Sequence, residues 1–280
     1  MLKRILSAVP IIIIVALAAI FQSWVMIVFA VVLALATQFE IVRALDKNGK
    51  PVVTYLSYAF SVILAAFFVG FFILLQKGMD YINWMPLMLL SAFVILIMLT
   101  FITAMFSKRH TADSVANTIF TFVYPQLFLA LFYMLILGNI GEYYRMLVVF
   151  LMVLVPAMFS DTFAYFFGMA FGKRKLCPQI SPKKTVAGSV AGIVGGVVGA
   201  LLITLLFWRG QNLAGFMAAG ALLGAVSQFG DLSASFIKRS LNIKDFGKIL
   251  PGHGGIVDRM DSILFCIPAV FILTIAGLVA

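Results

Sequence analysis

Apolar residues in this chain come in long blocks, and these blocks constrain the fold more than any other feature of the sequence. A run of about 18–20 apolar residues is long enough to cross the hydrocarbon core of a bilayer as a helix. The chain is 64% hydrophobic and only 11% charged, whereas a soluble domain is about 25% charged. The sequence therefore predicts an all-α fold, a polytopic bundle of transmembrane helices.

About nine spanning helices are expected, in a single integral membrane domain over residues 1–280. A basic start followed by an apolar run and Ala16–Leu17–Ala18 also resembles a signal peptide. A second apolar block follows at once, so we expect the first block to be retained as a span. The expected spans cover residues 5–21, 24–42, 54–75, 84–106, 115–138, 146–171, 187–208, 212–236 and 261–279.

The distribution of Lys and Arg indicates the orientation of these spans. If the N-terminus lies inside, only Lys77, Arg145 and Arg209 of the twenty basic residues fall outside. The other seventeen lie inside, as the positive-inside rule favours. We therefore expect a cytoplasmic N-terminus and a C-terminus outside. The net charge of +10 then reflects topology and attraction to anionic lipid headgroups, and we expect no nucleic-acid partner.

The ten acidic residues fall into two groups by position. Five lie in expected loops or near span ends, and we interpret them as solvated or interfacial charges: Glu40, Asp46, Asp80, Asp113 and Glu142. Of the other five, Asp161 and Asp231 lie inside expected spans, Asp245 lies in the basic loop after the second of these spans, and Asp258 and Asp261 stand at the start of the last span. A carboxylate in hydrocarbon costs about 2.5–3.5 kcal/mol on insertion scales. The second group is therefore expected to face a wet cavity or an ion-pair partner.

The spacing of these acids predicts a cation site. Asp258 and Asp261 are three residues apart, so a helix places them on one face. Asp231, Ser235 and Lys238 follow at steps of four and three, again on one face. An oxygen-rich set of this kind suits Mg²⁺, and the absence of paired His and Cys ligands argues against zinc.

A glycine-rich loop, residues 244–255, joins the two acidic helices. Its glycines allow close approach of backbone N–H groups to a ligand, and it precedes a helix start, where anions are favoured. Lys244, Lys248 and Arg259 add positive charge. The loop therefore indicates phosphate binding. His253 is open to two interpretations, a turn-stabilising or substrate contact and an acid–base role.

Two blocks of motif residues carry a resemblance to a known family. The first block runs Ser160–Asp161–Thr162–Phe163–Ala164–Tyr165, Gly168, Phe171–Gly172–Lys173 and Ile180–Ser181–Pro182–Lys183–Lys184–Thr185, with Gln228, Gly230, Asp231 and Leu232 further on. The second runs Ser235-x-x-Lys238-Arg239-x4-Lys244-Asp245-x-Gly247-x-x-Leu250-Pro251-x-His253-Gly254-Gly255-Ile256-x-Asp258-Arg259-Met260-Asp261. Together they resemble the CTP:phosphatidate cytidylyltransferases, also called CDP-diacylglycerol synthases.

The resemblance implies transfer of a cytidylyl group from CTP to phosphatidate, giving CDP-diacylglycerol and pyrophosphate. It implies Mg²⁺ as cofactor, held by Asp231, Asp258 and Asp261, and leaves open a monovalent cation beside it. Catalytic roles are implied for Asp231, Lys238, Arg239, Asp258, Arg259 and Asp261. Substrate binding is implied for Asp161, Ser181, Lys183, Lys184, Thr185, Ser235, Lys244, Asp245, His253, Gly254 and Gly255.

The resemblance also implies a place in the cell and a division of the chain. CTP, phosphatidate and the lipid bilayer would be the partners, in the inner (cell) membrane, with the active site facing the cytoplasm. Residues 1–145 would supply N-terminal helices, and residues 146–280 the catalytic helices with the signature at 235–261. We expect Lys183 and Lys184, on a loop, to hold substrate in ground and transition states alike. Ala187 stands where the family usually has Glu.

Small residues at steps of four predict close helix packing, within the protomer or across a homodimer, and we expect a homodimer. These residues are Gly188, Gly192, Gly196 and Ala200, then Gly220 with Gly224, and Gly168 with Gly172. Three other functions stay open. Intramembrane acids also mark ion-coupled transporters, although we see no inverted repeat. A CTP-dependent lipid kinase would share the architecture, and a scaffold protein would leave the charged residues unexplained.

Overall fold

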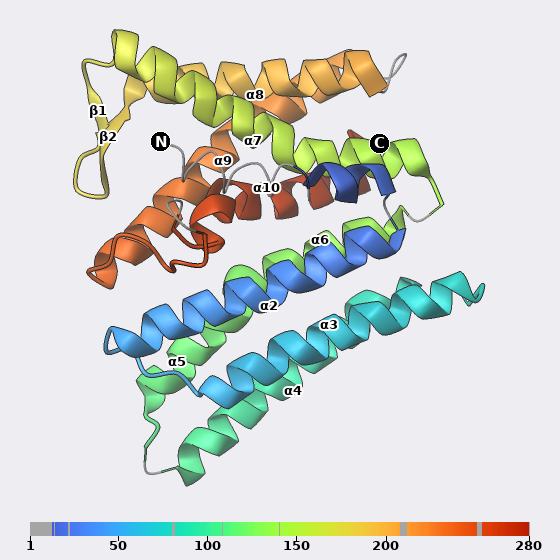
Figure 1. Cartoon of the computed structure of the whole chain (residues 1–280), viewed down its shortest axis with the longest axis vertical. Coiled ribbons are helices and arrows are strands. Elements are labelled where there is room, and N and C mark those ends of the chain that lie inside the picture. The colour runs from blue at the N-terminus through green and yellow to red at the C-terminus, as the bar shows by residue number, and fades with distance from the viewer. Residues whose placement is uncertain are drawn as a thin grey trace. The chain divides into compact units, whose positions relative to one another are not determined.

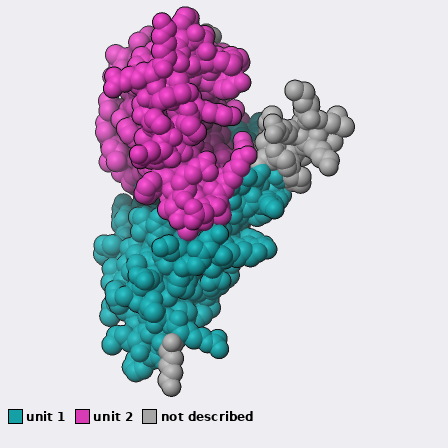
Figure 2. Space-filling model, turned by 90° about the vertical axis from the view of Figure 1, so that its left-hand side faces the viewer, with its two compact units in different colours: residues 1–138, 245–257 teal, residues 139–244, 258–280 magenta. Residues whose placement is uncertain are grey.

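The computed structural model describes residues 13, 15–21, 23–79, 82–107, 109–139, 141–207, 212–250 and 254–279. Helices dominate these residues, which confirms the expected helical bundle. Seven of the helices in this part of the chain are long and apolar enough to cross a membrane. The chain forms two compact units, Met1–Gly138 with Asp245–Val257 and Asn139–Lys244 with Asp258–Ala280 (Figure 2).

The first unit is built from helices that run side by side (Figure 1). α2 packs against α3, α5 and α6. The elements are α2 (Ser23–Lys47), α3 (Thr54–Gln76), the 3₁₀ turn η1 (Ile82–Trp84), α4 (Met85–Phe106), α5 (Ala112–Thr121), the π-helical turn η2 (Phe122–Leu127) and α6 (Phe128–Gly138).

The expected span 115–138 is interrupted in its middle. Pro125 lies within η2, and Tyr124 has non-helical backbone angles of φ −117° and ψ 116°. Pro125 has no N–H to donate, so the regular helix loses a backbone hydrogen bond there. The segment Ala112–Gly138 is still long and apolar enough for one crossing.

Buried polar side chains link the helices of the first unit. The Gln38 side-chain amide donates to Ser57 O at 2.9 Å and to Thr121 Oγ1 at 3.2 Å. The Gln126 amide donates to Ala34 O at 2.8 Å. These bonds pair polar groups that would otherwise be buried at a cost in free energy.

The outer surface of the first unit is apolar. Only 17% of the most apolar stretch of α4 is buried, and Leu90, Met98 and Phe101 are among the exposed side chains of this helix. Exposed apolar surface of this extent is unfavourable in water and suits contact with lipid. The exposed face of α4 thus supports a position within a membrane.

The second unit packs α7, α8 and α9 closely together, with a short hairpin at one end (Figure 1). The last helix, α10, begins at Val257, and all of its later residues belong to this unit. The elements are α7 (Tyr143–Phe171), β1 (Lys175–Cys177), β2 (Ser181–Thr185), α8 (Val186–Phe207), α9 (Leu213–Ser240) and α10 (Val257–Ile275).

The first and last expected spans are not among the seven candidate helices found in the described residues. Most of residues 5–21 lies outside the described part of the chain. The last span corresponds to α10, whose first two turns carry Asp258, Arg259 and Asp261 and lower its mean hydropathy. The number of spans and the sides of the termini stay predictions.

Close packing at the small residues is confirmed within the protomer. A methyl group added at Gly196 would lie 2.7 Å from Gly224 Cα, and one at Gly192 would lie 2.9 Å from Ser160 Oγ. Gln228 reinforces the contact, because its side-chain amide donates to Ser189 O at 3.0 Å and to Gly224 O at 2.9 Å. The glycine rows therefore bring α7, α8 and α9 together.

The expectation that Lys183 and Lys184 lie on a loop was wrong. Both lie in strand β2, which pairs antiparallel with β1 through Lys175↔Thr185 and Cys177↔Ser181. The strands are short and mostly polar, and Thr185 is their one β-branched residue, so they show little of the pattern that marks a strand in a sequence. Pairing between the two arms stabilises them instead.

Candidate active site

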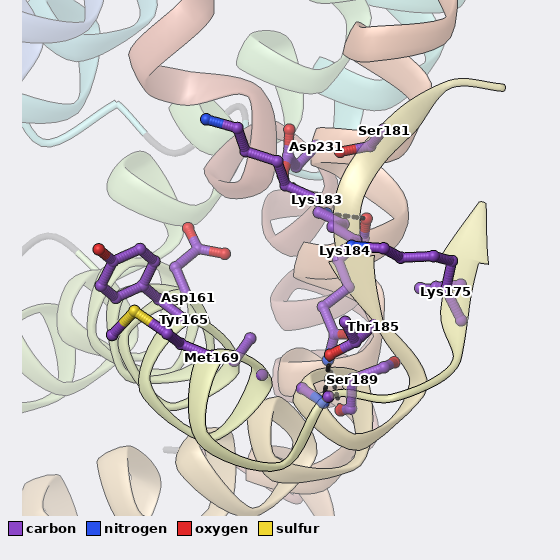
Figure 3. Close-up of a pocket in the computed structure, with 16 residues that line it drawn as sticks. Asp161, Tyr165, Met169, Lys175, Ser181, Lys183, Lys184, Thr185, Ser189 and Asp231 are labelled. Atoms are coloured by element: carbon purple, nitrogen blue, oxygen red, sulfur yellow. Dashed lines mark hydrogen bonds and ion pairs between the residues drawn. The ribbon is translucent and has the colours of Figure 1, made fainter. Parts of the chain in front are cut away.

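A pocket of about 610 Å³ opens in the second unit between α7, the β-hairpin, the start of α8 and α9 (Figure 3). Asp161, Tyr165 and Met169 lie on α7 at steps of four, so one helix face supplies all three. The hairpin lies across the pocket from them, and its lining residues include Lys175, Ser181, Lys183, Lys184 and Thr185.

Thr185 fixes the hairpin against α7 and α8. Its Oγ1 accepts the N–H of Gly188 at 3.1 Å, which satisfies an otherwise free donor in the first turn of α8. The same side chain lies against Gly168 on α7 and Gly172 just after it, and a methyl group added at Gly172 would lie 2.6 Å from it. Thr185 is thus an anchor of the pocket wall, in addition to lining it.

Lys184 joins the hairpin to α9 through an ion pair. Its Nζ lies 2.6 Å from Asp231 Oδ2 and 3.4 Å from Gln228 O (Figure 3). Ser235 donates to Asp231 Oδ1 at 3.4 Å, which confirms that these two residues share one helix face. Asp231 is therefore held from two sides at the pocket wall.

Three carboxylates of the second unit are linked by their surroundings. Asp161 and Asp231 line the same pocket, and Asp161 and Asp261 share one hydrogen-bonding neighbour. Ser262 is a hydrogen-bonding partner of two of them. Its Oγ donates to Asp161 Oδ2 at 3.3 Å and its N–H to Asp261 Oδ1 at 2.8 Å. We call Asp161, Asp231 and Asp261 the acidic trio.

Lys238 and Asp258 form a second, more deeply buried ion pair. The Lys238 Nζ lies 2.8 Å from Asp258 Oδ1, and the two side chains are 12% and 3% exposed. The charge of Lys238 also acts on Asp261. Lys238 therefore offsets part of the negative charge at the start of α10.

From Asp245 onward the glycine-rich loop belongs to the first unit, and two of its glycines there contact Glu40 of α2. The interpretation of Glu40 as a solvated or interfacial charge was wrong, since the residue is only 2% exposed. Its Oε2 accepts the N–H of Val257 at 2.9 Å, and its carboxylate lies directly against Gly247 and Gly255. A signal was present in the sequence, because Glu40 falls inside the expected span 24–42.

Comparison with known proteins decides the family. A family model described as "Cytidylyltransferase family" matches residues 2–276. The chain belongs to the cytidylyltransferase family. It is similar to the phosphatidate cytidylyltransferase of Bacillus subtilis, with 30% identity over 184 residues, covering 66% of each chain. The enzyme of the same name from Aquifex aeolicus is 33% identical over 170 residues, covering 61% of each.

A third relative is similar in sequence over a shorter region. The phosphatidate cytidylyltransferase of Haemophilus influenzae is 32% identical over 133 residues, covering 45% of each chain. This cytidylyltransferase-family chain thus spans between 45% and 66% of the length of these curated relatives. The family model alone extends over nearly the whole sequence.

The donor set of this cytidylyltransferase-family chain fits a hard cation. The acidic trio offers carboxylate oxygens, which Mg²⁺ prefers, and its mutual repulsion would be relieved by a divalent cation. Among the described residues, no three Asp, Glu, His or Cys side chains are grouped so that they could hold a metal ion by themselves. Substrate phosphate oxygens are ordinary Mg²⁺ ligands in such sites, which is consistent with a sparse protein contribution.

The other predicted site residues are placed less centrally. Arg239 is exposed, and its Nη1 donates to Ile243 O at 3.4 Å. Lys244, Asp245 and Arg259 are also exposed. Gly254 has a positive φ of 83° and accepts the N–H of Leu250 at 3.0 Å, so it shapes the loop. His253 lies outside the described residues.

Sequence reasoning missed several residues that line the pocket. Tyr165 and Met169 follow Asp161 at steps of four, a spacing that could have placed them on the same face. Lys175 and Ser189 carried no such signal, because the hairpin brings the first into place and the direct junction of β2 with α8 places the second in the first turn of that helix.

Proposed function

We propose that this chain is a membrane enzyme that transfers the cytidylyl group of CTP to phosphatidate, giving CDP-diacylglycerol and pyrophosphate. The observation that carries the proposal is the pocket wall where Lys184 meets Asp231, opposite Asp161. Lysines there can bind phosphate groups, and carboxylates can bind the cation that accompanies a nucleotide. Membership of the cytidylyltransferase family supports the same reaction.

The reaction needs positioning more than proton transfer. A phosphate oxygen of phosphatidate attacks the α-phosphorus of CTP, and the bond from that phosphorus to the β-phosphate oxygen breaks to release pyrophosphate. The attacking phosphate is already ionised at neutral pH, so no strong general base is required. Lys183 and Lys184 would hold phosphate oxygens at the pocket and offset the charge that spreads over them.

The cation would be held by Asp231 and Asp261 of the acidic trio, with Asp161 beside them. When bound, Mg²⁺ supplies charge neutralisation and Lewis-acid polarisation of phosphate oxygens. Asp258 as a further ligand stays a prediction, and its ion pair with Lys238 gives it a role at the start of α10 in any case. Ser235 and Ser262 would orient the carboxylates to which they donate.

The enzyme is proposed to lie in the cell (inner) membrane as a multi-pass protein, with its active site facing the cytoplasm. Seven candidate spans among the described residues support the multi-pass arrangement. The inside placement of seventeen of twenty basic residues supports the orientation, because the hairpin and the glycine-rich loop then face cytosolic CTP. A homodimer stays an expectation that mass measurement in detergent or nanodiscs would test.

Product analysis separates the proposed reaction from its alternatives. The purified protein is incubated in mixed micelles with Mg²⁺, phosphatidate and CTP, and released pyrophosphate, CDP and lipid products are measured. We expect pyrophosphate and CDP-diacylglycerol in equal amounts. Their formation should be about tenfold or more slower in Lys184→Ala but unchanged in Arg145→Ala, a partly exposed control position at the other end of α7. Release of CDP would instead identify a lipid kinase, and absence of both products would contradict the proposal.

A further inference from the structure

Glu40 is a buried carboxylate that no part of the reaction above uses. It lies near the C-terminal end of α2, and its partner Val257 follows it by 217 positions in the chain. A buried charge is costly unless it accepts strong hydrogen bonds. The bond from the Val257 N–H, at 2.9 Å, is of the charge-assisted kind, which is about twice as strong as a neutral one.

The glycine-rich loop is shaped to receive this carboxylate. A methyl group at Gly247 would collide with Glu40 Oε1, and one at Gly255 would collide with both carboxylate oxygens. Glycine at these two positions is therefore required by the close approach of Glu40. The contacts fall near the beginning and the end of the segment Asp245–Val257, so one side chain contacts both ends of the loop.

Glu40 also stabilises the start of α10. Val257 is the first residue of that helix, and its N–H is one of the donors that a helix leaves without an internal partner. A carboxylate at this end is favoured by the helix dipole as well as by the hydrogen bond. Asp258 follows Val257 directly in the chain, and Asp261 lies one turn further along the helix. The position of Val257 therefore constrains where these two carboxylates lie.

We propose that Glu40 is a positioning residue for the signature segment: its carboxylate organises the loop Asp245–Val257 and thereby sets the start of the helix that carries Asp258 and Asp261. The effect on turnover rests on the proposed cytidylyltransferase function. The effect on the loop itself does not, because it follows from contacts within the first unit alone. The two parts can therefore be tested separately.

Amide hydrogen exchange on the full-length protein in nanodiscs tests the structural part. In Glu40→Ala we expect exchange over residues 245–257 to rise about tenfold or more, the scale of losing a hydrogen bond to a charged acceptor. Exchange in α3 should stay as in the wild type. Gln38→Ala is the matched control, since Gln38 is equally buried on α2 but bonds to Ser57 and Thr121 instead.

The Gln38→Ala control should loosen the contact with α3 and leave residues 245–257 unchanged. The proposal is overturned if Glu40→Ala leaves loop exchange at the wild-type rate, or if exchange rises evenly over the first unit. Should Glu40→Ala fail to fold, Glu40→Gln replaces it. The Gln carbonyl can still accept from Val257 but its charge is lost, so we expect a smaller rise, again confined to the loop.

A double-variant cycle tests the contact directly. Gly255→Ala alone should raise loop exchange and lower kcat/KM, because the added methyl group displaces the Glu40 carboxylate. In the Glu40→Ala background the same methyl group has no carboxylate to displace, so it should add little. Equal effects of Gly255→Ala in the two backgrounds would refute the anchoring contact.

Steady-state kinetics test the catalytic part. Glu40→Ala should lower kcat about tenfold or more with little change in KM for CTP, and Glu40→Gln should recover part of that loss. An unchanged kcat in a variant with a loosened loop would show that the loop's order does not serve turnover. If the wild-type protein forms no CDP-diacylglycerol at all, the proposed function fails, while the exchange data still decide the anchoring role.

Discussion

Asp258 and Asp261 lie one turn apart on α10, yet their surroundings differ. Asp258 is paired at 2.8 Å with Lys238, whereas Asp261 accepts the N–H of Ser262 at 2.8 Å and belongs to the acidic trio. Removing one partner of a buried ion pair leaves the other charge uncompensated, and relieving a repulsion has the reverse effect. Residues that look equivalent in the sequence should therefore respond differently to the same substitution.

Asparagine at each position should separate these effects. We expect Asp258→Asn to destabilise the protein by about 3–5 kcal/mol, because it removes one of the two charges of a buried ion pair. Asp261→Asn should abolish turnover with thermal stability equal to or above that of the wild type. Thermal unfolding in detergent, followed by activity at saturating Mg²⁺, measures both. Equal stability losses in the two variants would contradict the assigned pairing.

The position of Lys184 in the structure changes the effect that we expect from its substitution. Uniform substrate binding was expected because the residue was assigned to a separate loop, but its amine lies 2.6 Å from Asp231. We now expect Lys184→Ala to lower kcat by about tenfold or more, the scale of one charge-assisted hydrogen bond (about 1.5–3 kcal/mol). Kinetics with each substrate varied in turn would test this. A change in KM alone would instead indicate that Lys184 binds substrate equally in the ground and transition states.

The sequence predicted the acids at the centre of the candidate site but not the partners of those acids. Asp161, Asp231 and Asp261 were identifiable because carboxylates are costly within apolar spans. The pairing of Lys184 with Asp231 depends on a hairpin, and that of Glu40 with Val257 joins residues 217 positions apart. Neither is visible from local spacing, since each depends on how distant segments pack.

At the scale of elements, the helices were predictable and the irregular pieces were not. Long apolar blocks correspond to α2, α3, α4, α7, α8 and α9 within a few residues. The turn η2 was missed although Pro125 marks it, because an apolar run hides a local change of backbone angles. The strands β1 and β2 were missed because their residues are polar and their pairing supplies the stability.

The glycine packing of α8 on α9 makes a testable element-scale prediction. Gly196→Ala should destabilise the second unit by about 1–3 kcal/mol, because the methyl group would press against the backbone of Gly220 and Gly224. Gly70→Ala is the control, in a helix position with no atom within 4 Å of the added methyl group. It should be neutral or stabilise by up to about 1 kcal/mol. Similar unfolding curves for both variants would contradict the close packing.

At the scale of the whole molecule, the orientation of the spans is open to direct test. In a background lacking Cys177 and Cys266, a single Cys at position 248 should react with a membrane-impermeant thiol reagent only from the cytoplasmic side. A single Cys at the exposed position 79, in the loop after α3, should react only from outside. Labelling of position 248 in intact cells would overturn the orientation and the access of cytosolic CTP.

The chain enters the first unit a second time, at Asp245, and leaves it again at Val257. Residues 1–138 and 139–280 therefore cannot be exchanged independently between proteins, although the family motifs all lie in residues 139–280. A chimera that joins residues 139–280 to foreign N-terminal helices would bring a glycine-rich segment without the side chain around which it folds. Such a graft would need an acidic residue at the position of Glu40, with glycines kept opposite it, before its signature segment could adopt the native arrangement.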